Sequence, residues 1–92
     1  MLLAMDIVHN RERNRFEVAL GSGEVAELTY SLKPDTLSIT HTYVPDTARG
    51  RGVAGRMTQA ALEYARSHDL DVIPLCSYAA AYMARQRRNQ PS

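Results

Sequence analysis

Residues 44–56 read Val-Pro-Asp-Thr-Ala-Arg-Gly-Arg-Gly-Val-Ala-Gly-Arg, a glycine-rich turn that joins an extended segment to an amphipathic stretch. Glycine lacks a Cβ, so the backbone of such a turn can approach a ligand closely. The first turn of the following helix presents unpaired amides to an anion. The segment therefore predicts a phosphate-binding site. The residues predicted to form it are Val44, Arg49, Gly50, Arg51, Gly52, Val53, Ala54, Gly55 and Arg56.

The turn has two other interpretations. The glycines also suit a tight turn and close packing without any ligand. A nucleoside triphosphate site is disfavoured, because no Gly-Lys-Ser or Gly-Lys-Thr closes the loop to hold the terminal phosphates and magnesium. The arginines at 49, 51 and 56 favour a small polyanion held at the mouth of the helix.

The chain before the turn predicts four antiparallel strands. β-prone segments separated by turn residues cover 6–10, 15–20, 25–32 and 36–44. In the fourth segment the alternation places Leu37, Ile39, His41 and Tyr43 on one face. Strands that precede all helices indicate an α+β architecture rather than a doubly wound repeat.

The chain after the turn predicts a helix, a strand and a second helix. Residues 53–68 have a helical period with one apolar side. The apolar run 72–76 predicts a short central strand parallel to the one before the helix, with a bulge or a splayed neighbour at Pro74. Ser77 is the expected N-cap of a helix over 78–86, and residues 89–92 are expected to be frayed. The sequence thus predicts a single domain over 1–92, with a mixed sheet of about five strands and two main helices.

Composition excludes several function classes. The formal net charge of +1 argues against binding of long nucleic acid. The single cysteine, Cys76, permits no internal disulfide and fits a reducing compartment, so a cytoplasmic location is expected. No stretch approaches a membrane span, and the apolar start at 1–5 is too short for a signal peptide. His9 and His68 lack partners at metal-ligand spacing, so no metal site is expected.

The order strand, glycine turn, helix, strand, thiol and short helix resembles the GNAT superfamily of acetyltransferases. Its acetyl-CoA motif is Arg or Gln, two residues, Gly, one residue, then Gly or Ala, which Arg49, Gly52 and Ala54 match. The flanking segments 41–45 and 72–78 look like those of the compact GNAT-like subfamily that lacks the usual first helices. The resemblance covers residues 16–85 and implies a GNAT-like fold, acetyl-CoA as cofactor and an amine as acceptor.

Three side chains are candidates for the chemistry. Cys76 precedes a predicted helix, whose positive end favours a thiolate that could accept acetyl; the alternative is a small buried hydrophobe. His41 could take the proton of an ammonium acceptor or activate the thiol, or could be a hydrogen-bonded core histidine. The resemblance implies a tyrosine that protonates the departing CoA thiolate. Tyr82 is chosen over Tyr78, although both could simply pack against the sheet.

The sequence therefore predicts an acetyl-CoA-dependent N-acetyltransferase that acts on an unidentified amine, by direct transfer or through acetyl-Cys76. A CoA-binding or acyl-sensing module without turnover is the alternative, and an adaptor that only retains the fold is a third. Arg85, Arg87 and Arg88 either receive the adenosine phosphate end of CoA or complement the dipole at a solvated helix end. A monomer or weak homodimer is expected.

Overall fold

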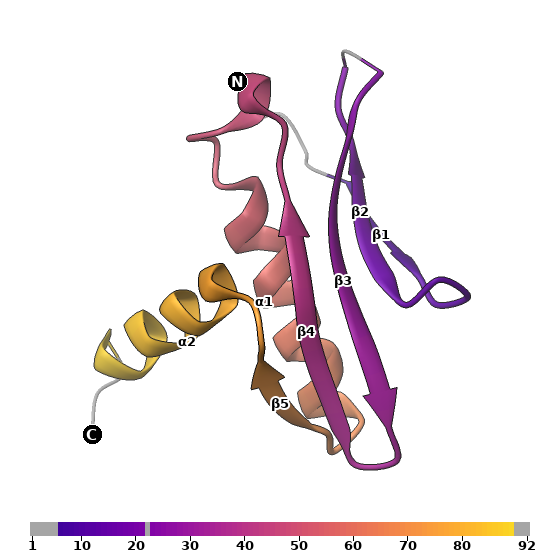
Figure 1. Ribbon diagram of the computed structural model, residues 1–92, viewed down its shortest axis with the longest axis vertical. Coiled ribbons are helices and arrows are strands. Elements are labelled where there is room, and N and C mark those ends of the chain that lie inside the picture. Colours follow the sequence, from indigo (N-terminus) through magenta and orange to yellow (C-terminus); the bar gives the residue numbers. More distant parts are fainter. Residues whose placement is uncertain (1–5, 22, 90–92) are drawn as a thin grey trace.

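The computed structural model describes residues 6–21 and 23–89 and contains one five-stranded sheet and two α-helices (Figure 1). A short 3₁₀ turn, η1, precedes the first helix. The elements in chain order are β1 (Ile7–Asn10), β2 (Arg15–Ala19), β3 (Val25–Lys33), β4 (Thr36–Tyr43), η1 (Asp46–Ala48), α1 (Val53–Ser67), β5 (Asp71–Pro74) and α2 (Ser77–Asn89).

The sheet is mixed, with strand order β1-β2-β3-β4-β5. Strands β1 to β4 form an antiparallel meander, and β5 pairs in parallel with β4. The predicted α+β architecture and the parallel pair are confirmed. The prediction of a central strand over 72–76 is wrong, because β5 lies at the edge of the sheet. An edge tolerates Pro74, whose missing N–H costs no ladder bond there.

Helix α1 covers one face of the sheet and forms the core with it (Figure 1). Leu28, Leu37, Ile39 and Met57 are fully buried between them. The alternating residues of β2 and β3 reach the same layer, because successive side chains of a strand point to opposite faces. The buried ones are Phe16, Val18, Ala26, Leu28 and Tyr30.

A β-bulge in β4 reverses the alternation that the sequence predicts. Thr29 pairs with His41 and Tyr30 with Ile39, so Thr40 is an extra residue without its own partner. Its hydroxyl donates to the Thr29 carbonyl at 3.2 Å. Because one residue is inserted, every later side chain changes face. The prediction that His41 and Tyr43 share a face with Leu37 and Ile39 is therefore wrong.

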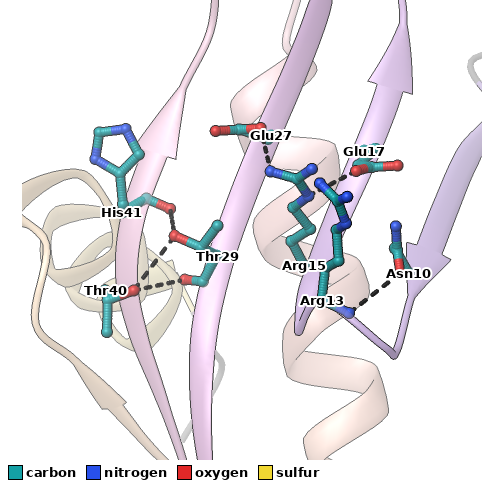
Figure 2. A network of polar contacts seen from close by, with 8 residues as sticks. All are labelled: Asn10, Arg13, Arg15, Glu17, Glu27, Thr29, Thr40 and His41. Carbon is teal, nitrogen blue, oxygen red and sulfur yellow. Dashed lines mark hydrogen bonds and ion pairs between the residues drawn. The ribbon is translucent and has the colours of Figure 1, made fainter.

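After the bulge, His41 and Tyr43 lie exposed on the sheet face opposite α1, whereas Thr42 and Val44 turn toward the α1 side. We call the face opposite α1 the open face. Figure 2 shows the His41 ring standing on this face, near the Thr29 and Thr40 side chains that hold the bulge.

Charged side chains of β2 and β3 occupy the open face beside His41 (Figure 2). Glu17 and Glu27 are direct cross-strand neighbours, a pairing of like charges that destabilises a sheet. Arg15 lies between them, with Nη1 donating to Glu27 Oε1 at 3.0 Å and Nε 2.7 Å from Glu17 Oε2. The guanidinium therefore offsets the repulsion between the two carboxylates.

On the α1 face, His9 joins an aromatic cluster between β1 and α1. Its ring stacks on Phe16 with centroids 4.0 Å apart and meets Tyr64 edge-on at 4.6 Å. Nε2 shares a hydrogen bond with the Tyr30 hydroxyl. Burial lowers the pKa of His9 from its ordinary value of 6.5, and the nearby charges of Arg11 and His68 lower it further.

This cluster predicts a loss of stability in mild acid. A depressed pKa means that, as pH falls below about 6.5, the unfolded chain takes up a proton at His9 before the folded chain does. The stability that neutral His9 contributes is thus complete above that pH, and it declines as the pH falls toward the pKa of His9 in the folded state. The midpoint of thermal unfolding should fall more between about pH 8 and about pH 5 in the wild type than in His9→Phe, which keeps the ring. Equal falls would contradict the assignment.

Candidate functional site

The candidate site lies where β4 continues past the end of β5. The parallel pairing runs from Thr36–Asp71 to Ile39–Pro74 and then stops. The amides of Leu75 and Cys76 both donate to the Ile39 carbonyl, at 2.9 and 3.2 Å, and the chain then turns into α2. The pairing of β4 with β5 thus ends at Pro74, the position where the sequence predicts a bulge or a splayed neighbour. The remainder of β4 is left with one edge unpaired by β5.

A cavity of about 480 Å³ opens beside this part of β4, on the α1 side. Its wall combines the end of β4, the glycine turn, the first turn of α1 and the start of α2. The lining residues are Thr42, Val44, Ala48, Arg49, Gly50, Gly52, Val53, Ala54, Gly55 and Tyr78. The predicted loop residues thus meet at one cavity, except Arg51 and Arg56, which are exposed and do not line it.

The glycine turn has the backbone that its sequence requires. Gly50 has φ +85° and Gly52, the N-cap of α1, has φ +78°, a left-handed conformation that L side chains rarely adopt. A Cβ added at either position would meet nothing within 4 Å, so the space beside both is open. The turn therefore leaves room for a ligand against its backbone.

Helix α1 begins without a capping side chain. No side chain bonds to its first amides, and its first turn contains no acidic residue. The positive end of its dipole therefore faces the cavity without a negative group to compensate it. Arg49 pairs with Asp46 at 3.2 Å, but both side chains are largely exposed, at 71% and 87%. Such an exposed pair contributes little, so Arg49 can turn to an anion.

Cys76 is the N-cap of α2, and the prediction that Ser77 has this role is wrong. Ser77 is the first helical residue, and the Ala80 amide donates to the Cys76 carbonyl at 3.1 Å. Cys76 Sγ accepts from the Ala79 amide at 3.4 Å, as the side chain of an N-cap does. Sγ also lies 3.4 Å from Thr42 Oγ1. Cys76 is half-buried and does not line the cavity.

Of the two tyrosines on α2, Tyr78 lines the cavity and Tyr82 does not. Both pack beside Gly55: a Cβ on that glycine would lie 3.4 Å from Tyr78 Oη and 3.5 Å from Tyr82 Cε2. These are ordinary van der Waals distances, so both rings lie directly against the start of α1 at Gly55. The Tyr78 hydroxyl consequently points at the first turn of α1.

The structure does not bring all predicted catalytic side chains together. His41 stands on the open face, whereas Cys76, Tyr78 and Tyr82 lie toward α1 and α2. Thr42, which lines the cavity and contacts Cys76, was missed. Strict alternation along β4 places it on the wrong face, and no signal in the sequence marks the bulge. Ala48 was also missed, because a small apolar residue in a turn predicts nothing specific.

The described residues contain no group of three or more His, Cys, Asp or Glu side chains placed to hold a metal ion. Within the same residues, neither helix has the length and apolarity needed to cross a membrane.

Known proteins share the sequence pattern and the fold described above. Residues 15–91 match the family model described as GCN5-related N-acetyl-transferase. Protein NATD1 of Xenopus tropicalis is 35% identical over 79 residues, which cover 84% of this chain and 72% of that protein. Protein NATD1 of Homo sapiens is also 35% identical over 79 residues, which cover 84% of this chain and 70% of that protein. The solution NMR structure of a GCN5-like protein from Staphylococcus aureus superposes with a TM-score of 0.73 at 28% identity, covering 91% of this chain and 82% of that one. The chain therefore belongs to the family of GCN5-related N-acetyltransferases.

Proposed function

We propose that the protein is an acetyl-CoA-dependent N-acetyltransferase that transfers acetyl directly to an amine. One observation carries the proposal: the cavity joins an uncapped helix N-terminus to the part of β4 that β5 leaves unpaired. A diphosphate fits the first feature, because helix N-termini bind anions through backbone amides. When bound, acetyl-CoA would supply the acetyl group as an activated thioester.

The residues that would hold the cofactor belong to the glycine turn and the first turn of α1. The amides of Val53, Ala54 and Gly55 face the cavity without a capping side chain. Gly50 and Gly52 leave the approach to them open. Arg49 supplies a positive charge at the mouth, and Thr42 and Val44 form the wall along β4.

The two faces of β4 suggest separate approaches for cofactor and acceptor. The cavity lies on the α1 side, and His41 stands on the open face one residue after the bulge. An amine entering from the open face would reach the unpaired part of β4 beside His41. A neutral imidazole there would accept the proton of the ammonium group, and Tyr78 Oη, at the cavity wall, would donate a proton to the leaving group.

The geometry of Cys76 favours direct transfer over an acetyl-cysteine intermediate. Its sulfur already accepts the Ala79 amide and contacts Thr42, and it lies outside the cavity lining. An acetylated sulfur would lose its place as the cap of α2. We therefore assign Cys76 to holding the start of α2, and with it Tyr78, in position.

The test compares transfer by Cys76→Ser and His41→Gln with the wild type. Serine is a good N-cap and should keep both the fold and the acetylation of a reactive amine from a small-amine library, detected by mass spectrometry. His41→Gln should bind CoA normally and transfer acetyl roughly a hundredfold more slowly. Loss of transfer in Cys76→Ser, together with an acetyl group retained on wild-type Cys76, would contradict direct transfer.

A CoA-binding module without turnover is the second candidate. The observation that favours it is the freedom of His41, whose ring has no hydrogen-bond partner among the described residues. The same experiment separates the candidates. Binding of CoA without acetylation of any amine or of Cys76 would favour the module, and absence of CoA binding would favour an adaptor. It stays a prediction that the acceptor is an amine and that the protein is a monomer or a weak homodimer.

A further inference from the structure

Glu27 lies close to His41 on the open face, where the acceptor amine is proposed to enter. In the register of β3 and β4, Glu27 is directly opposite Tyr43, and Thr29 is directly opposite His41. Glu27 and His41 are therefore diagonal neighbours, and such neighbours lie roughly 7–8 Å apart on a sheet. Figure 2 shows both side chains standing on the same face. A short aliphatic ligand at His41 can thus also contact Glu27.

The Glu27 carboxylate is held by Arg15 without being neutralised by it. Arg15 Nη1 donates to Glu27 Oε1 at 3.0 Å, and Nε of the same guanidinium lies 2.7 Å from Glu17 Oε2. One guanidinium thus serves two carboxylates, so these three side chains carry one negative charge in excess. The Glu27 side chain is 30% exposed, and Figure 2 shows its second oxygen directed toward β4. Arg13, the other cation in Figure 2, stands on the Glu17 side, farther from His41.

The two sides of β4 therefore differ in charge. On the α1 side, Arg49 and the uncapped N-terminus of α1 present positive charge to the cavity. On the open face, the excess charge near His41 is negative, and the exposed ring of Tyr43 lies directly opposite Glu27. An ammonium group is attracted both to a carboxylate and to the face of an aromatic ring. The open face thus favours a cationic acceptor and disfavours one that carries a carboxylate.

We propose that the acceptor is a short aliphatic diamine, with its reacting amine beside His41 and its second ammonium group bound to Glu27. This inference rests on the proposed acetyl transfer and names its substrate class. The reacting nitrogen gives its proton to His41 and forms the N–C bond as the C–S bond of the thioester breaks, and Tyr78 Oη donates a proton to the leaving sulfur. The second nitrogen keeps its proton and its charge. Arg15 is a positioning residue, because it orients the Glu27 carboxylate.

Three acceptors of similar length test the assignment: 1,4-diaminobutane, butylamine and 4-aminobutanoate. Their far ends are positive, neutral and negative, respectively. The wild type should acetylate 1,4-diaminobutane with a kcat/KM about two- to fivefold higher, per amino group, than that of butylamine, as expected for one partly exposed ion pair. Butylamine should exceed 4-aminobutanoate by a similar factor. Steady-state kinetics with acetyl-CoA gives kcat/KM for each acceptor.

Three variants test whether Glu27 causes this order. Glu27→Gln removes the charge and keeps the size of the side chain, so the three kcat/KM values should become nearly equal. Arg15→Gln should enlarge the preference for the diamine, because both carboxylates then lack their cation. The control is Glu63→Gln, which makes the same change of net charge on α1, away from the open face, and should keep the wild-type order. A purely structural role of Glu27 would lower all three values by one factor and leave their order unchanged.

The possible results separate this inference from the proposed function. Equal kcat/KM values for the three acceptors in the wild type, or an unchanged order in Glu27→Gln, would overturn the diamine assignment and leave acetyl transfer intact. Failure of the wild type to acetylate any amine would overturn the proposed function, and this inference with it. Thermal unfolding checks that Glu27→Gln and Arg15→Gln are folded, and the comparison of the three acceptors in the wild type depends on neither variant.

Discussion

Replacing Ala54 by glutamate should greatly weaken CoA binding and leave the protein as stable as before or more stable. Ala54 is in the first turn of α1, which has no acidic residue and no side-chain cap. A carboxylate there would stabilise the helix by about 0.3–1 kcal/mol through the dipole. The same carboxylate would repel the diphosphate, so the affinity for CoA should fall roughly a hundredfold or more. Calorimetric titration gives the affinity, and thermal unfolding without ligand gives the stability.

The control for Ala54→Glu is Gln59→Glu, which changes the net charge equally on the exposed side of α1, away from the cavity. It should keep the affinity for CoA and lose a few tenths of a kcal/mol, because the new charge lies one turn from Glu63. An increase in stability together with a decrease in the affinity for CoA is the result expected of Ala54→Glu at an anion site on a helix N-terminus. If Ala54→Glu bound CoA as tightly as the wild type, the diphosphate assignment would be wrong.

Tyr78→Phe should lower kcat by roughly 10² to 10⁴ with little change in the affinity for CoA. The phenol is the acid–base group of α2 that lines the cavity, and removing its oxygen removes the proton donor but keeps the ring. Steady-state kinetics with the amine found by the library screen would give kcat, and calorimetry the affinity.

Tyr82→Phe is the matched comparison for the tyrosine assignment. The ring of Tyr82 packs beside Gly55 and under Arg85, and its hydroxyl is outside the cavity lining. Its loss should therefore leave kcat near the wild-type value. The result that would reverse the roles is a large fall of kcat in Tyr82→Phe with Tyr78→Phe nearly unaffected, which would support the choice made from the sequence.

The core was predictable because its signals are local. Period-two alternation placed Leu37 and Ile39 on one face of their strand, where both are buried, and the helical period of residues 53–68 gave the buried side of α1. The glycines at 50 and 52 marked the turn because only glycine adopts their φ values easily. Each of these features depends on residues within a few positions of one another.

The bulge at Thr40 could not be predicted, because it depends on how β4 pairs with β3. The extra residue is defined by the register between Thr29–His41 and Tyr30–Ile39, and neither strand has a local mark for it. Its consequence is large: it moves His41 to the open face and brings Thr42 to the cavity and Cys76. The division of the proposed site between two faces of the sheet therefore depends on one inserted residue.

By itself, the sequence determined the α+β class, the order of the elements and the glycine turn that opens α1, because backbone propensities and hydrophobic periods act over short stretches of chain. Only the tertiary structure decided that β5 lies at the edge, that Cys76 caps α2 and that Tyr78 rather than Tyr82 lines the cavity. These outcomes depend on contacts between segments distant in the chain, such as Gly55 against α2 and Thr42 against Cys76. Such contacts are set by strand register and by the close approach of two helices, which spacing along a single chain does not encode.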